Sequence, residues 1–395
     1  MSSERQSGWE DDASVSRQKL GLRDRIAHFT WANFTCTQST GGMSILLSET
    51  PHQFHGLQTV GAVIFILNVA LFVLFCAAMA ARFILHPHMF KRSFTNPPEP
   101  FYISTFWVSI ETIIICIQRF GVPHTGPWLI VAVRVLFWIY AAVTLIFSTV
   151  MWIILATKSQ IKAIELHPVI FLLIVNTMLT GTIASVLIPS QPPVHRMSMI
   201  VAAVAYQGLG WTVTTMLLAW HLASVLERGL GSPSQRFGMF MPVAAPSYAI
   251  VCLIGCSRHL PADYGYFAQH PLAVEILQVV ALWASIFLWL VTFWLFALVL
   301  VATIPVMLPF RNHRFEPQMH FTLAWWGLVF PNIGFALATA YIGTELGSPA
   351  IHWVATIMTI LLFAVWLMNL MLHVKAVATG QIMWPGRDED VIKSD

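Results

Sequence analysis

Long apolar segments alternate with short polar ones along almost all of the 395 residues. A helix needs about 20 apolar residues to cross the hydrocarbon core of a bilayer, and ten segments come close to that length or exceed it. They predict an all-α membrane protein whose transmembrane domain covers 26–378, between tails at 1–25 and 379–395. The expected spans are 27–48, 57–84, 101–119, 128–157, 168–188, 197–226, 238–257, 272–308, 320–343 and 350–376.

The odd-numbered spans are rich in Ser, Thr, Gly, Asn and Pro, whereas the even-numbered ones, except the sixth, are mostly large and apolar. Close packing between helices would by itself explain a small or hydroxyl residue at any one of these positions. The alternation as a whole favours five helical hairpins around a central pore, each with a polar inner and an apolar outer helix. A proline within a span leaves backbone groups without a helical hydrogen bond, and these groups are tolerated where they face a cavity. The residues expected to line the path are Ser39, Thr40, Gly41, Gly42, Ser109, Thr177, Thr180, Pro246, Ser247 and Pro331.

The composition excludes a soluble protein. Hydrophobic residues make up 57% of the chain and charged residues only 10%, with a mean hydropathy of +0.71. A soluble domain carries about 25% charged residues, so this chain has too few to cover a surface in water. The ten spans also exclude a seven-helix receptor.

Basic residues fix the expected orientation. Seventeen of the 21 Lys and Arg residues fall on the side of the two termini, which an even number of spans places together. The opposite side holds Arg119, Arg196 and Arg258, and Arg134 lies within a span. Because basic loops stay in the cytoplasm, both tails are expected to be cytoplasmic.

Two charges fall inside predicted spans and away from the span ends, Glu111 in the third and Arg134 in the fourth. These spans form one hairpin, so the two side chains either form a structural ion pair or act separately. In the second case Arg134 snorkels outward or attracts anions, and Glu111 takes up a proton that couples transport to pH. Arg119 and Arg258 at one end, and Arg82 at the other, either attract anions or anchor the helices at the interface.

No pattern of catalytic residues is present. The five cysteines lie in apolar segments without the spacing of metal ligands, and no nucleophile lies in a pattern with a base. We therefore expect no enzyme, no metal, no cofactor and no nucleic-acid partner.

Several segments occur in an order typical of one family: FTWANFTCTQSTGG at 29–42, TPH at 50–52, RFILHP at 82–87, FWVSI at 106–110, FGMFMP at 237–242 and AWWGLVFP at 324–331. They resemble the fungal malic acid transport proteins, which are C4-dicarboxylate carriers. These belong to the tellurite-resistance/dicarboxylate transporter superfamily, together with plant slow anion channels and yeast sulfite efflux pumps. The resemblance covers about 25–378.

This resemblance implies ten helices around a pore lined by the odd-numbered spans, a homotrimer, and a phenylalanine that plugs the pore. The matching residue is Phe330. Gln38 and Glu111 depart from the family pattern, and both bring polar groups toward the path. The expected function is transport of malate and other C4-dicarboxylates across the plasma membrane. A sulfite efflux pump or an inorganic anion channel is the alternative.

Overall fold

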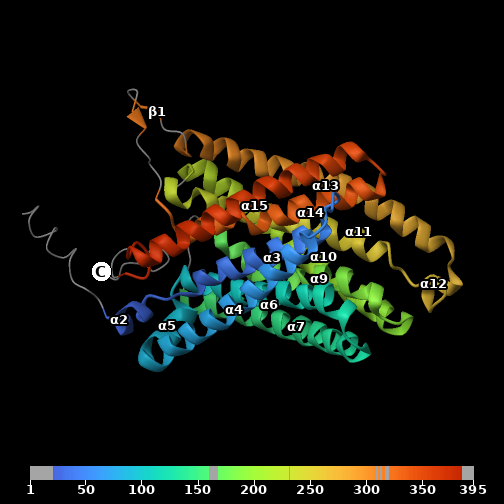
Figure 1. The fold of residues 1–395 in the computed structure, drawn as a ribbon, viewed down its shortest axis with the longest axis horizontal. Coiled ribbons are helices and arrows are strands. Elements are labelled where there is room, and N and C mark those ends of the chain that lie inside the picture. Colours follow the sequence, from blue (N-terminus) through green and yellow to red (C-terminus); the bar gives the residue numbers. More distant parts are fainter. Residues whose placement is uncertain are drawn as a thin grey trace, which may run out of the picture.

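The computed structural model describes residues 21–159, 168–230, 232–307, 310–311, 314–315 and 320–384 (Figure 1). Most of the two expected tails, 1–20 and 385–395, lies outside these ranges. Within them, nine segments are long and apolar enough to cross a membrane. The remaining span is the first, in which the short η1 (Trp31–Asn33) leads into the 16-residue α3 (Phe34–Glu49). The chain is therefore a bundle of ten spans, as predicted.

The odd-numbered spans are mostly built from two or three consecutive helical pieces. After η1 and α3, they are α6 (Glu99–Cys116) with η2 (Ile117–Gly121), η6 (Pro168–Phe171) with α8 (Leu172–Met178) and α9 (Thr180–Leu187), η8 (Pro233–Val243) with α11 (Ala244–Ser257), and η9 (Leu323–Leu328) with α14 (Phe330–Glu345). We call these spans the inner ring.

The even-numbered spans are long α-helices, which we call the outer ring. They are α4 (Leu57–Leu85), α7 (Pro127–Ile154), α10 (Pro193–Arg228), α13 (Leu272–Met307) and α15 (Pro349–Ala378). Shorter elements connect the spans: α2 (Leu22–Ala27), α5 (His88–Thr95), η3 (Val122–His124), η4 (Leu155–Ser159), η7 (Ile188–Ser190), α12 (Tyr266–Gln269) and one antiparallel pair, β1 (Phe310–Arg311) with β2 (Arg314–Phe315).

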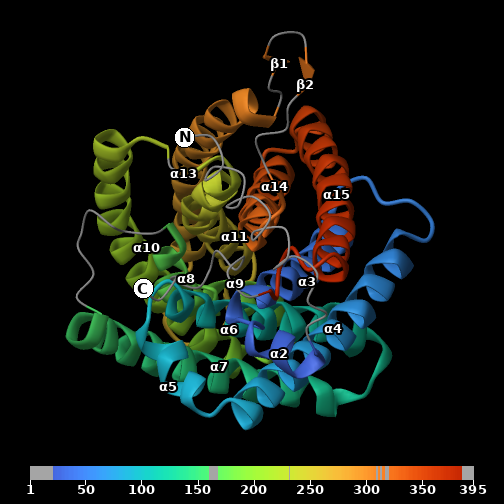
Figure 2. The same cartoon turned by 90° about the vertical axis from the view of Figure 1, so that its left-hand side faces the viewer.

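The inner ring is closed. In chain order α3 packs on α6, α6 on α8 and α9, α9 on α11, and α11 on α14, and α14 returns to α3 (Figure 2). Each outer helix lies against its own hairpin partner and the next inner helix along the chain; α4, for example, contacts α3 and α6, and α15 contacts α14 and α3. The predicted two-ring arrangement is confirmed.

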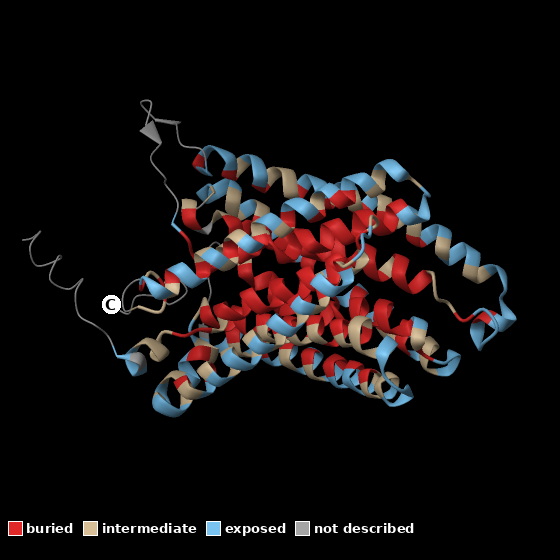
Figure 3. Cartoon of the chain, in the orientation of Figure 1, coloured by how far each residue is buried: buried red, intermediate tan, exposed pale blue. Residues whose placement is uncertain are grey.

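Burial separates the two rings (Figure 3). In the four long inner spans 72% to 100% of the apolar stretch is buried, compared with 17% to 33% in the outer ring. Outer helices present large apolar side chains such as Ile66, Ile146 and Phe287 outward, which suits contact with lipid tails rather than water. The polarity difference in the sequence thus follows the position of each helix.

Small and hydroxyl residues let inner helices approach closely. A Cβ built on Gly41 of α3 would lie 2.2 Å from Thr112 Oγ1 of α6. Between the same two helices, the hydroxyls of Thr37 and Ser109 are 2.7 Å apart. Gly334 of α14 likewise lies against Ser247 of α11, because its built Cβ would be 2.6 Å from the Ser247 hydroxyl.

Pro246 and Pro331, which we expected to line the path, lie where the helix type changes. Pro246 falls in the first turn of α11, directly after the 3₁₀ helix η8, and Pro331 is the second residue of α14, after η9. The first-turn N–H groups of a helix have no partner within it, so proline removes no bond there. Neither residue therefore bends an α-helix at mid-length.

Both ends of the described chain meet at one end of the bundle. Arg25, in the last turn of α2, donates a hydrogen bond to the carbonyl of Val377 in α15, and its guanidinium lies 5.9 Å from the centre of the Trp384 ring. Gln381 Nε2 donates to the carbonyl of Phe321 at 2.8 Å. Residues 21–25 and 379–384, which we expected to belong to the tails, thus contact the helical domain.

The contact between Gly41 and Thr112 leads to a prediction. A methyl group at position 41 does not fit unless α3 and α6 move apart, so we expect Gly41→Ala to lower stability by about 1–3 kcal/mol. The measurement is thermal unfolding of the purified protein in detergent. Gly208→Ala is the control, because a Cβ there meets nothing within 4 Å. Equal melting temperatures for the two variants would contradict this account of the packing.

Candidate transport path

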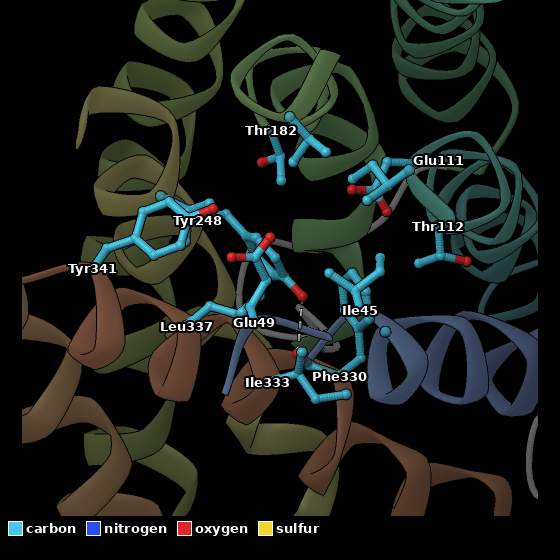
Figure 4. A pocket seen from close by; sticks show the side chains of 14 residues that line it. Ile45, Glu49, Glu111, Thr112, Thr182, Tyr248, Phe330, Ile333, Leu337 and Tyr341 are labelled. Atoms are coloured by element: carbon cyan, nitrogen blue, oxygen red, sulfur yellow. Dashed lines mark hydrogen bonds between the residues drawn. The ribbon is translucent and has the colours of Figure 1, made fainter. Parts of the chain in front are cut away.

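A narrow cavity lies on the axis of the inner ring (Figure 4). All inner spans contribute to its wall: Gly42, Ile45 and Glu49 from α3, Glu111, Thr112 and Ile115 from α6, Thr182 and Val186 from α9, Tyr248 and Val251 from α11, and Phe330, Ile333, Leu337 and Tyr341 from α14. A water molecule can occupy only about 10 Å³ of it, which is close to the minimum that holds one water. The path is therefore nearly closed.

The lining residues follow helical periodicity. On α14 they recur at 330, 333, 337 and 341, and on α3 at 42, 45 and 49. Spacings of three and four residues keep side chains on one face of a helix. Each inner helix thus turns one continuous face to the axis, and its remaining faces contact neighbouring helices.

Phe330 lines one end of this cavity. Only 1% of its surface is exposed, and its ring stacks on Tyr248 with centroids 5.1 Å apart. The Tyr248 hydroxyl donates to the Phe330 carbonyl at 3.2 Å (Figure 4). Gly42 makes room for the ring, since a Cβ there would lie 3.3 Å from Phe330 Cδ2.

Phe330 and Tyr248 belong to an apolar cluster, which we call the seal. Its other members, from α6, α8, α11 and the junction between α8 and α9, are Val108, Val175, Met178, Leu179, Ala244 and Ala245. Apolar groups that line a narrow path do not hydrate an anion.

Glu111 is the charged residue nearest the seal on its own helix face, three positions beyond Val108. It is 1% exposed, and its Oε2 atom has no hydrogen-bond partner among the described residues. The ion pair with Arg134, one of the two predicted alternatives, is not formed. Arg134 is on the outer helix α7 and donates to Gln191 Oε1 at 3.4 Å.

The arginines expected to attract anions are neutralised by carboxylates. At the end of the bundle opposite the chain termini, Arg119 pairs with Glu49, and Arg258 pairs with Glu345. Both pairs join neighbouring inner spans, and Glu49 lines the cavity. Arg258 also donates to the carbonyl of the lining residue Tyr341 at 3.0 Å. We call these two ion pairs the mouth.

Arg82 lies elsewhere. It forms a two-bond ion pair with Glu99, and both residues are at most 5% exposed. Ser93 adds a hydrogen bond to the same carboxylate at 3.0 Å. This group joins α4, α5 and α6, so the described contacts of Arg82 are structural.

Of the ten residues predicted to line the path apart from Phe330, only Gly42 is in the wall of this cavity. The hydroxyls bond to backbone or to other helices: Ser39 to Trp326, Thr40 to Cys36, Ser109 to Thr105, Thr177 to Thr144 and Ser247 to Val243. Thr40 also accepts from the Trp366 indole of α15 at 3.1 Å. Gly41 packs on Thr112, Thr180 is buried away from the lining, and Pro246 and Pro331 begin helices.

Most residues in the wall of the cavity were not predicted from the sequence. The predicted residues are polar or small, whereas the wall contains Ile45, Ile333 and Leu337 beside Thr112 and Thr182. Counting three and four positions onward from Phe330 would have found those on α14. Among the described residues, no group of three or more His, Cys, Asp or Glu side chains is placed to hold a metal.

Comparison with known proteins agrees with this geometry. Residues 28–374 match the model of the voltage-dependent anion channel family (SLAC1). The chain belongs to this family. The chain is 30% identical to a malic acid transport protein of Schizosaccharomyces pombe over 96% of its own length and 85% of that protein's. It is 28% identical to a putative malic acid transport protein of the same yeast, and 26% identical to the sulfite efflux pump SSU1 of Trichophyton rubrum over 90% of its own length and 93% of the pump's.

The buried carboxylates of Glu111 and Glu99 differ in their partners, and this difference leads to a prediction. Glu111 lacks a counter-charge, and burying a charge in the membrane is unfavourable, so Glu111→Gln should leave the melting temperature unchanged or raise it. Glu99→Gln leaves the buried Arg82 without its charge partner and should lower stability by about 3–5 kcal/mol. Thermal unfolding in detergent compares the two. A marked loss of stability in Glu111→Gln would mean that its carboxylate supports the fold.

Proposed function

We propose that this protein carries small organic anions, most favourably malate and other C4-dicarboxylates, through the path enclosed by the inner ring. The observation that supports this most is the cavity itself, which is walled by every inner span and has Phe330 in its wall. Two relatives named as malic acid transport proteins, each matched over 96% of this chain, favour a dicarboxylate.

The mouth suits the entry of a dianion. Arg119 and Arg258 are each held by one carboxylate, and both are partly exposed to solvent. Partly exposed ion pairs contribute little net stability, so a carboxylate of the substrate can exchange with Glu49 or Glu345 without large loss. In this proposal the substrate exchanges with the protein's own carboxylates at the mouth instead of entering a site with free cations.

Glu111 then faces the arriving anion. Two like charges about 4 Å apart repel by roughly 4 kcal/mol at the effective dielectric constant of a protein surface, and the cavity beside Glu111 is more enclosed than a surface. A proton on Glu111 removes this repulsion, so each anion would pass together with a proton. Transport by Glu111→Gln should accordingly lose its dependence on pH, whereas the wild-type flux rises as the pH falls.

Sulfite efflux is the second candidate function. The relatives named sulfite efflux pump SSU1 match 90% of this chain, and the small free volume of the cavity is nearer to the size of an inorganic anion. Uptake of labelled malate, sulfite and chloride into proteoliposomes separates the candidates. Saturable malate uptake without sulfite uptake supports our proposal, and sulfite uptake without malate uptake contradicts it.

The proposed role of Phe330 leads to a separate prediction. Phe330→Ala removes the ring without changing a charge, so we expect a higher flux of malate and weaker selection by anion size, with a smaller effect for Phe330→Leu. Phe335→Ala is the matched control. Phe335 is also a buried phenylalanine on α14, but it stacks against Trp289 and Phe296 of α13. If the Phe330→Ala protein folds but transports no faster than the wild type, Phe330 is a packing residue and does not restrict transport.

We further propose that both termini are cytoplasmic, that the protein resides in the plasma membrane, and that it is a homotrimer. The distribution of basic residues supports the orientation. Cysteines introduced at Ser2 and Ser394, outside the described residues, should resist an impermeant thiol reagent in intact cells. Chemical crosslinking in membranes, with a trimer as the largest product, tests the oligomeric state.

A further inference from the structure

Gln38 is a buried amide without a hydrogen-bond partner. It lies on α3 and is 0% exposed, and neither Nε2 nor Oε1 bonds to any described residue. Its neighbours on α3 behave differently, because Thr37 donates to the carbonyl of Phe34 and Thr40 to that of Cys36. Burying an amide without partners is unfavourable by about 1–3 kcal/mol on the scale of protein substitutions, so the fold alone gives no reason for a glutamine here.

The position of Gln38 on α3 places it on the helix face that lines the path. The lining residues Gly42, Ile45 and Glu49 follow it at four, seven and eleven positions, which is the spacing of one helix face. Gln38 is therefore the next residue of the lining face of α3, one turn past Gly42 toward the end where the chain termini meet.

The packing of α3 on α6 fixes its level. Gly41 lies against Thr112, and the hydroxyls of Thr37 and Ser109 are 2.7 Å apart. Gln38 thus lies at the level of Ser109 and Ile110, between Val108 of the seal and Glu111. Four positions before Val108, the hydroxyl of Ser104 is also fully buried and has no described partner. Unpartnered neutral polar groups therefore occur at the seal and beyond it.

We infer that Gln38, with Ser104 beyond it, forms a hydrogen-bonding site that receives a 2-hydroxy-dicarboxylate as it passes Phe330. This inference rests on the proposed function and deepens it. Nε2 donates to a carboxylate oxygen of the substrate, and Oε1 accepts from its hydroxyl group. Both orphaned atoms are satisfied together only by a ligand that carries an acceptor and a donor.

The absence of a formal charge on this site suits passage. An arginine here would hold a dianion strongly, whereas a pore needs sites weak enough for the ion to leave. A site with a buried acceptor also discriminates, because an analogue without the matching donor leaves that acceptor unpaired. Malate carries the hydroxyl group and succinate does not, so wild-type protein should transport malate with the lower KM.

The experiment compares Gln38→Leu with Gln207→Leu. Gln207 is the matched control because its two amide atoms are also buried without partners, but it lies on the outer helix α10, against Gly181 of α9. Each variant is measured for its melting temperature with and without malate, and for its KM for malate and succinate at neutral pH, where succinate is a dianion.

In Gln38→Leu we expect an unchanged or higher melting temperature without ligand, because leucine suits an apolar surrounding better than an orphaned amide. The KM for malate should rise on the order of tenfold, the preference over succinate should vanish, and the stabilisation by malate should fall. Gln207→Leu should match the wild type in KM and preference. Ser104→Ala should show a smaller rise in KM.

Three results overturn the inference: a wild type that does not distinguish malate from succinate, an unchanged KM in Gln38→Leu, or a lower melting temperature of this variant together with unchanged transport, which would mean that Gln38 binds a structural water only. Failure of the proposed function is a separate result. If the wild type carries sulfite but not malate, the 2-hydroxy-dicarboxylate site is overturned with it, whereas malate transport that is insensitive to Gln38 leaves the proposed function standing.

Discussion

The close approach of the inner helices is the constraint on which the rest of the structure depends. Glycine at 41 lets α3 lie on α6, and glycine at 334 lets α14 lie on α11. This packing leaves only a narrow cavity on the axis, with Phe330 in its wall. Because hydroxyl groups between the helices bond to carbonyls one turn back or to the adjacent helix, as Ser109 does with Thr105, few polar groups remain to face the axis.

Electrostatics follow from the same geometry. Ion pairs in the described part of the domain join helices at both ends: Arg82 with Glu99 at one end, and the two ion pairs of the mouth at the other. Glu111 differs, because it faces the cavity and one of its carboxylate oxygens is unpartnered. Glu111 and Gln38 both lie on the axis-facing sides of their helices and carry polar atoms without described partners. We assign to them the contacts with a proton and with the substrate.

The sequence predicted the fold well because the bilayer imposes simple lengths and polarities. Expected spans such as 57–84 and 350–376 differ from α4 and α15 by at most two residues at either end. The alternation of polarity along the chain matches the inner and outer rings. Candidate site residues were harder to predict. Ser39, Thr40 and Thr177 are polar because they join helices, and polarity alone does not distinguish that role from lining a path. Phe330 came from the resemblance to a family. The carboxylate partners of Arg119 and Arg258 lie far away in the sequence and were not foreseen.

The order in which the ring closes has a consequence for biosynthesis. Each outer helix covers its own inner partner and the next one, and α14 completes the ring against α3. A nascent chain that has inserted only its first four hairpins therefore has an open seam, along which the polar faces of α3 and α11 meet lipid. Those faces need a temporary partner, such as an insertion chaperone, until the last hairpin arrives. Chains truncated before α14 should accordingly be targets of membrane quality control, even though every helix they contain is apolar enough to insert.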